Sequence, residues 1–233
     1  KNNVKLVRGD FRELDQILRE LSIEPVDGVL FDFGVSSHQL DVAERGFSFS
    51  APAQLDMRMD KSQPTTAADL VNNLSERELA DLIYIHSDER WARRIARAIV
   101  RRREKSPITT TAELAEVVAS AIPSKAHPQR IHPATRTFQA LRIAVNSELE
   151  ALDKGMEAAA RSLTIGGRLV LISYHSLEHR AVKKFLTVGS GRCQCPPGLP
   201  QCVCGARQFL KVLTKKPITP SEEEIQENPR SRS

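Results

Sequence analysis

Two short polar motifs each follow an apolar run of the sequence, and each holds side chains suited to proton or amine chemistry. Asp32 lies near the end of the run at residues 29–33, and His175 stands just after the run at residues 168–173. Apolar runs of this kind are typical of central parallel strands covered on both faces. Ligands of such sheets bind at the carboxyl ends of the strands, so Asp32 and His175 are expected to line one crevice.

Each of these residues also has an ordinary structural interpretation. A carboxylate such as Asp32 can accept hydrogen bonds from an amine, but an Asp after a strand also caps the backbone N–H groups of a turn. The imidazole of His175 titrates near neutral pH and can hold or relay a proton. It can equally bond locally while Ser176 caps a helix predicted at residues 177–186. The sequence leaves both interpretations open.

The alternation of apolar patterns predicts an α/β protein with a parallel sheet. Strands are expected at residues 4–7, 29–33, 168–173 and 208–214, and helices at 11–21, 134–163 and 177–186. Residues 67–133 show only helical patterns and are predicted to form an inserted helical domain, with residues 1–66 and 134–233 forming the sheet domain. The stretch at 34–66 is rich in Ser, Asp, Gly and Pro, and a loop of that length is usually functional or disordered.

One helix of the predicted insertion is strongly basic. Trp91, Ile95 and Ile99 are spaced by four and form its apolar seam, which leaves its arginines on the opposite face. Residues 90–105 contain one acidic residue, Glu104, and eight basic residues. The basic residues are Arg90, Arg93, Arg94, Arg97, Arg101, Arg102, Arg103 and Lys105. Solvated helix faces usually mix charges of both signs. The segment therefore favours contact with nucleic-acid phosphates, especially at Arg94, Arg97 and Arg101.

A second basic feature lies at the start of the helix predicted at residues 134–163. Arg136 and Arg142 stand there together with Thr135 and Thr137, and the N-terminus of a helix can bind phosphate. From composition alone, a solvated helix start explains the same residues.

All four cysteines of the chain are Cys193, Cys195, Cys202 and Cys204. Four thiolates this close in sequence can form a tetrahedral zinc site that ties down a loop. The usual zinc signature is Cys-x-x-Cys, however, and reduced thiols or a facultative disulfide fit the spacing as well. Secreted disulfide scaffolds spread their cysteines, so the clustering favours a reducing cytoplasm. No apolar run approaches the roughly 20 residues that span a bilayer.

Seven segments along essentially the whole chain together resemble the bacterial RsmH/MraW family. They are residues 31–41, 43–49, 55–60, 89–96, 132–142, 173–178 and 228–233. The resemblance implies a class I, Rossmann-like methyltransferase sheet with an inserted helical domain, and S-adenosylmethionine as the cofactor. It also implies an enzyme that methylates the exocyclic N4 of a cytidine in the decoding region of small-subunit (16S) rRNA.

The resemblance further implies that Phe11, Asp32 and Gln39 contact the cofactor. Asp32 and His175 are then the candidate catalytic residues. Arg136 and Arg142 join the basic helix as candidate contacts to rRNA or the small ribosomal subunit.

The sequence departs from the family in one respect. Members carry a glycine-rich cofactor loop and an acidic ribose-binding residue, and this chain has no Gly-x-Gly-x-x-Gly motif. In the family two further strands lie between those corresponding to residues 4–7 and 29–33, so these two should not pair and the sheet should be incomplete. We interpret the chain as truncated at both ends. A non-catalytic RNA-binding fragment, or an amino-methyltransferase acting on another substrate, remains an alternative.

Overall fold

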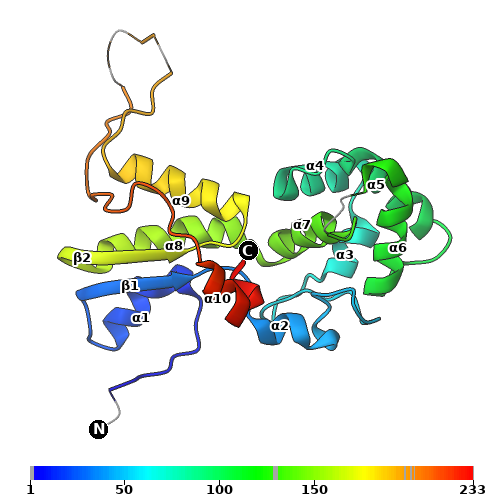
Figure 1. Ribbon diagram of the computed structural model, residues 1–233, viewed down its shortest axis with the longest axis horizontal. Coiled ribbons are helices and arrows are strands. Elements are labelled where there is room, and N and C mark those ends of the chain that lie inside the picture. The colour runs from blue at the N-terminus through cyan, green and yellow to red at the C-terminus, as the bar shows by residue number, and fades with distance from the viewer. Residues whose placement is uncertain (1–2, 128–130, 197, 200, 202, 233) are drawn as a thin grey trace. The chain divides into compact units, whose positions relative to one another are not determined.

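The computed structural model describes the chain except for residues 1–2, 128–130, 197, 200, 202 and 233 (Figure 1). It divides into two compact units: Lys1–Gly34 with Leu149–Ser233, and Val35–Glu148. The fold is mixed α/β, as predicted. Among the described residues, no helix is long and apolar enough to cross a membrane.

The first unit is built on two parallel strands. β1 (Val26–Asp32) pairs with β2 (Leu163–Ile172), and Asp32 stands opposite Ile172 in the register. Figure 1 shows the two strands side by side. This pairing confirms the two strands predicted before the polar motifs, and it brings their carboxyl ends together.

Helices cover one face of this pair. The buried cluster there consists of Phe31, Phe33, Leu152, Met156, Ala159 and Val182. Its helical members come from α8 (Glu148–Ser162) and α9 (Ser176–Gly189), and Leu14 of α1 (Leu14–Glu20) packs at its border. Leu30 and Val170 point to the opposite face and are mostly exposed. In the described part of the chain the sheet is therefore packed on one side only.

Two predicted strands of this unit are absent from the described residues. Residues 4–7 are exposed and have no partner strand there, so their apolar pattern produces no ladder. Residues 208–214 contain one isolated bridge, at Gln208, and no strand. Near the C-terminus the unit also contains the short helix α10 (Glu222–Glu227).

The helix predicted at residues 134–163 is two helices. α7 (Thr135–Asn146) ends at Ser147, whose φ is 49°, and α8 begins at the next residue. A left-handed residue interrupts the helical hydrogen-bond ladder although the apolar spacing continues across it. This break between the two helices was not visible in the periodicity.

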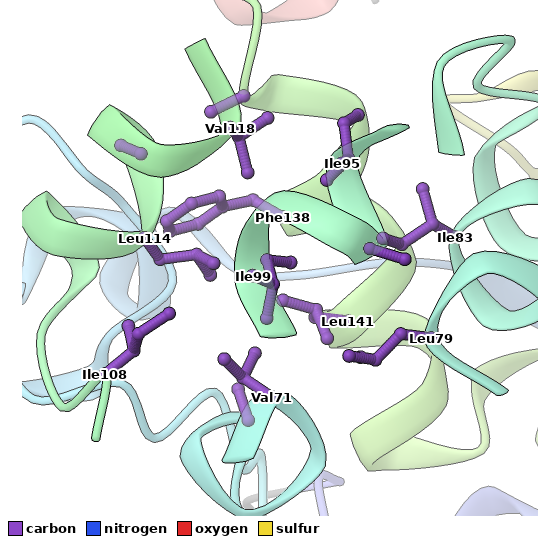
Figure 2. Packing of buried hydrophobic residues seen from close by; sticks show 14 of the residues in the cluster. Val71, Leu79, Ile83, Ile95, Ile99, Ile108, Leu114, Val118, Phe138 and Leu141 are labelled. Carbon is purple, nitrogen blue, oxygen red and sulfur yellow. The ribbon is translucent and has the colours of Figure 1, made fainter. Parts of the chain in front are cut away.

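The second unit is predominantly helical. Its α-helices are α2 (Ser37–Asp41), α3 (Ala67–Asn73), α4 (Glu76–Ser87), α5 (Ala92–Arg103), α6 (Thr111–Ala121) and α7. Capping boxes at Ser75 and Thr110 begin α4 and α6. Ile95 and Ile99 of α5 are fully buried in the core shown in Figure 2, which confirms the apolar seam.

This unit is wider than the insertion predicted at residues 67–133. The loop before α3 buries Phe47, Leu55 and Met57 in the same core, and α7 adds Phe138 and Leu141. Residues 35–66 and 135–146 therefore belong to this compact unit. Burial of these apolar side chains explains the difference between the predicted boundaries and the compact unit.

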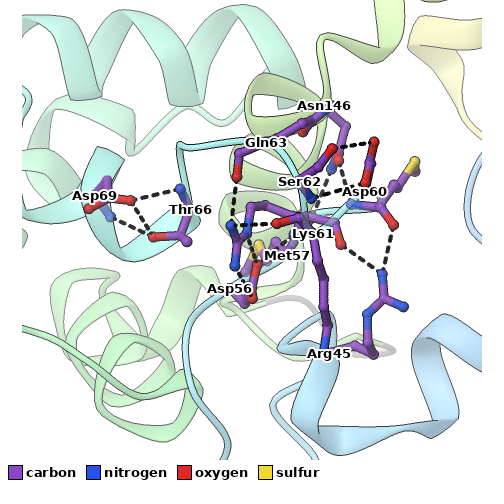
Figure 3. Close-up of polar contacts among 12 residues, drawn as sticks. Arg45, Asp56, Met57, Asp60, Lys61, Ser62, Gln63, Thr66, Asp69 and Asn146 are labelled. Atoms are coloured by element: carbon purple, nitrogen blue, oxygen red, sulfur yellow. Dashed lines mark hydrogen bonds and ion pairs between the residues drawn. The ribbon is translucent and has the colours of Figure 1, made fainter.

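Polar contacts hold this long loop in one conformation (Figure 3). Arg58 forms a bidentate pair with Asp56, at 2.7 Å (Nε–Oδ1) and 3.0 Å (Nη2–Oδ2). The side chain of Asn146 accepts from the Met59 N–H at 2.7 Å and donates to the Met57 carbonyl at 2.8 Å. Met57 has a φ of 63°, a left-handed conformation that these contacts stabilise. Asp56, Met57, Arg58 and Met59 of the 55–60 motif therefore have a structural role.

Candidate active site

Asp32 and Tyr174 meet at the carboxyl ends of the two strands. Asp32 ends β1, and Tyr174 follows β2 by two residues. The Tyr174 hydroxyl donates a hydrogen bond to Asp32 Oδ1 at 2.7 Å. This bond, followed by partial burial and the negative charge of Asp32, raises the pKa of Tyr174 to about 12. The phenol is therefore protonated at neutral pH and remains a donor to the carboxylate.

A buried carboxylate organises the turn that carries Tyr174. Glu178 of α9 is only 1% exposed. It accepts hydrogen bonds from the backbone N–H of Tyr174 at 2.7 Å and of His175 at 3.3 Å. Burial by itself raises the pKa of Glu178, but the hydrogen bond from His175, together with these N–H groups, outweighs it and lowers the pKa.

His175 takes part in the same turn. It is the N-cap of α9, where its Nδ1 accepts from the Glu178 N–H at 3.4 Å. Its Nε2 lies 3.1 Å from a Glu178 carboxylate oxygen. Both ring nitrogens therefore face Glu178, and His175, rather than the predicted Ser176, caps the helix. The catalytic role of His175 stays a prediction, while its structural role is visible.

Phe11 presents an aromatic ring beside the same sheet face. Its ring centroid lies 5.5 Å from that of Phe31 and 6.3 Å from that of Phe33. The ring is 38% exposed, and a side chain added at Gly155 would collide with it. Gly155 thus leaves room for a partly exposed aromatic surface, which can stack on a flat heterocycle.

Gln39 lies in α2, within the second unit. Its side-chain oxygen accepts from the Ser36 N–H at 2.9 Å, and its own N–H donates to Ser36 Oγ at 3.3 Å. This capping box fixes the side chain and leaves the amide NH₂ group as a potential donor to a ligand. The predicted cofactor contact of Gln39 stays a prediction.

Three of the five arginines predicted to bind RNA lie on the exposed side of α5. Arg94, Arg97 and Arg101 are all exposed, opposite the buried Ile95 and Ile99. Arg97 Nε is 3.3 Å from a carboxylate oxygen of Glu76. Such an exposed ion pair contributes little to stability, so Arg97 can exchange this partner for a phosphate.

A pocket of about 430 Å³ opens beside the start of α5. Its lining residues are Glu89, Arg90, Trp91, Ile122, Ala126, Pro133 and Arg136. Glu89 is buried, accepts from the Trp91 N–H at 2.9 Å, and lies 3.9 Å from the guanidinium of Arg136. An indole, a buried carboxylate and two guanidinium groups are suited to a base and its phosphate.

Arg142 has a different environment from Arg136. Its Nε and Nη2 donate to the two carboxylate oxygens of Glu148 at 2.8 and 2.9 Å, and both side chains are largely buried. This bidentate pair gives Arg142 a structural role within its unit. We therefore leave Arg142 out of the RNA-contact proposal.

Comparison with known proteins identifies the family. The model of the MraW methylase family matches residues 1–233. This chain belongs to the MraW methylase family. It is 54% identical over 231 residues to a ribosomal RNA small subunit methyltransferase H of Geotalea daltonii, covering 99% of this chain and 74% of that protein. A Caldicellulosiruptor saccharolyticus protein of the same name is 51% identical over 232 residues, covering 100% of this chain and 75% of the relative.

The family membership confirms the resemblance seen in the sequence. In this MraW-family chain, sequence patterns did not single out Tyr174, Glu178 or the pocket at Trp91. A signal for Glu178 was present, because His175 and Glu178 have the spacing of a capping box. A signal for Tyr174 was its position directly after a predicted strand. Neither pattern by itself indicates which residue the side chain of Glu178 or Tyr174 would contact.

Three cysteines of this MraW-family chain are brought together on one loop. The sulfur atoms of Cys193, Cys195 and Cys204 all lie within 4.8 Å of one another. Cys202, the fourth residue of the predicted set, lies outside the described residues.

Proposed function

We propose that this chain catalyses methyl transfer from S-adenosylmethionine to the exocyclic N4 of a cytidine in small-subunit rRNA. The observation that carries the proposal is the Asp32–Tyr174 pair at the carboxyl ends of adjacent parallel strands. Family membership supports the methyltransferase class, and the names of the relatives support the rRNA substrate. The choice of N4 and of cytidine rests on the resemblance of the sequence motifs.

The described residues fit part of a cofactor site. Phe11 offers a partly exposed aromatic surface to the adenine ring, and Asp32 is an exposed acceptor at the strand edge. Gly34 has a φ of 90° and makes the tight turn that follows Asp32. Bound S-adenosylmethionine supplies an electrophilic methyl group on a sulfonium sulfur. Gln39 is proposed as a further contact through its amide NH₂ group.

Asp32 is proposed to orient the target amine. The lone pair of a cytosine amine is delocalised into the ring, so the nitrogen is a poor nucleophile. A carboxylate that accepts its N–H hydrogen bond pulls the nitrogen toward tetrahedral geometry and can take the released proton. Such general-base assistance contributes about 100- to 10,000-fold. Tyr174 holds this carboxylate in place, and Glu178 and His175 hold Tyr174.

The second unit is proposed as the inserted RNA-binding part of the enzyme. Arg94, Arg97 and Arg101 supply phosphate contacts, and the pocket with Trp91 and Arg136 suits an unstacked nucleotide. Structured rRNA is recognised mainly through its shape and through unstacked bases. Because the substrate is rRNA, we place the reaction in the cytoplasm.

The test is transfer of a labelled methyl group from S-adenosylmethionine to small ribosomal subunits, followed by mass spectrometry of the digested rRNA. We expect N4-methylcytidine from the parent chain and a loss of at least about 100-fold in rate for Asp32→Asn. Asp27→Asn, the same change at the other end of β1, is the matched control. Methylation of another position would disprove the N4 assignment. RNA binding without any transfer would support a non-catalytic RNA-binding fragment instead.

A further inference from the structure

The cysteines lie on a loop that leaves α9 and returns along it. A bridge between Ser190 and Gln208 closes the base of the loop, and the Phe209 N–H donates to the Gly189 carbonyl at 2.9 Å. Between these ends, none of the described residues of 191–207 is buried. No apolar cluster therefore holds together the described part of this loop.

The three described sulfur atoms come from both arms of the loop. Cys193 and Cys195 lie on the outgoing arm, and Cys204 lies on the returning arm. The sulfurs of Cys193 and Cys204 are 3.8 Å apart, and all three sulfurs lie within 4.8 Å of one another. At a Zn–S distance of about 2.3 Å, tetrahedral sulfur ligands are about 3.8 Å apart. The cluster is therefore close to the geometry of a zinc site.

Backbone N–H groups point at each of these sulfurs. The Gln194 N–H donates to Cys204 at 3.4 Å, and the Val203 N–H donates to Cys195 at 3.3 Å. Both of these bonds cross from one arm of the loop to the other. The Cys195 N–H donates to Cys193 at 3.4 Å. The same N–H groups would donate hydrogen bonds to metal-bound sulfur.

We propose that Cys193, Cys195 and Cys204 bind a zinc ion as thiolates and that the ion clips the two arms together. Each thiol loses its proton to solvent on binding, and a water molecule or a further protein donor completes the four tetrahedral ligands. Soft thiolates select zinc over magnesium or calcium, which prefer oxygen ligands. A disulfide would join only two of these sulfurs, at about 2.05 Å, and leave the third outside the bond. The site is structural, because its ligands come from the loop that they fasten.

Metal analysis of the full chain tests this proposal. Protein purified under reducing conditions in the presence of zinc, then dialysed, should retain about one zinc ion per chain. The double variant Cys193→Ser and Cys204→Ser should lose it. Val203→Ala changes an exposed side chain of the same loop and leaves all thiols in place, so it should retain the ion.

A second measurement needs no variant. Zinc should protect the thiols from alkylation by N-ethylmaleimide, followed by mass spectrometry, and a strong chelator should remove that protection. Equal zinc content in the parent and the double variant would overturn the proposal. So would equal alkylation rates before and after chelation, or a disulfide within the cluster in the zinc-treated protein.

Discussion

Asp32 and Tyr174 form the pair on which the proposed chemistry depends, and Asp32→Asn tests it directly. The variant keeps an acceptor oxygen but removes the charge. The hydrogen bond to Asp32 is the main reason that the pKa of Tyr174 is raised to about 12. We therefore expect the pKa of Tyr174 in the variant to fall toward its ordinary value of about 10.

The free energy involved follows from this pKa. A rise from about 10 to about 12 corresponds to about 2.7 kcal/mol at face value. Tyr174 is 40% exposed, however, so water screens the interaction, and we expect about 1 kcal/mol to remain. Because the folded pKa lies above the unfolded one, this stabilisation is complete below about pH 10 and disappears as the pH rises through about 12. At neutral pH, Asp32→Asn should therefore lower the free energy of unfolding by about 1 kcal/mol.

Phenolate absorbance measures this pKa. The chain has two tyrosines, so Tyr84→Phe leaves Tyr174 as the remaining phenol. Near pH 11, a larger fraction of Tyr174 should be ionised with Asn at position 32 than with Asp. Circular dichroism at the same pH checks that the chain is folded.

Asp27→Asn in the same background is the control for this titration. Asp27 lies near the other end of the same strand, where it accepts a hydrogen bond from Thr164 at 3.3 Å. Asp32, by contrast, stands opposite Ile172, two residues before Tyr174. Asp27→Asn should therefore leave the titration unchanged. Identical titration curves for Asp32→Asn and its parent would refute the pairing, and with it the proposed positioning of the carboxylate.

Three further predictions concern RNA binding, acid stability and the core. Reversing the charges at Arg94, Arg97 and Arg101 should weaken rRNA binding and reduce the salt slope by about 2 to 3, measured by filter binding across salt concentrations; an unchanged slope would contradict the proposed interface. The pKa of Glu178 is lowered, because its hydrogen bonds outweigh the effect of burial, so its stabilisation is lost as the pH falls through that lowered value. Glu178→Gln should flatten the acid side of a plot of Tm against pH, and a plot parallel to that of the parent would disprove this role. Ile99→Ala removes a fully buried side chain and should cost about 2 to 5 kcal/mol in denaturant unfolding, so a cost below 1 kcal/mol would mean that α5 is not packed as described.

Local patterns predicted the elements around the site well. The apolar run before Asp32 indicated β1, and the four-residue spacing of Trp91, Ile95 and Ile99 indicated α5. These signals succeed because the physical cause lies within a few residues of the effect. Residues 4–7 show the limit, since a strand pattern produces a strand only where a partner is available.

Contacts between distant residues were beyond such patterns. The long loop before α3 is held by Asn146, which bonds the backbone of Met57 and Met59 from nearly ninety positions away in the sequence. Asp32 and Tyr174 are separated by 142 residues. The sequence pattern can place Asp32 and Tyr174 each at the end of a strand, but only the sheet register brings their side chains together.

Methyl transfer and rRNA binding are proposed for different units, so a failure of one proposal can be told apart from a failure of the other. Asp32 belongs to the first unit, whereas Arg94 and its neighbours belong to the second. Asp32→Asn should therefore abolish methyl transfer and leave the salt slope of rRNA binding unchanged. The charge reversal should lower affinity but permit transfer at saturating rRNA. If each variant instead impaired both properties equally, the effect would be on folding of the whole chain, and the assignment of chemistry and RNA affinity to separate units would be wrong.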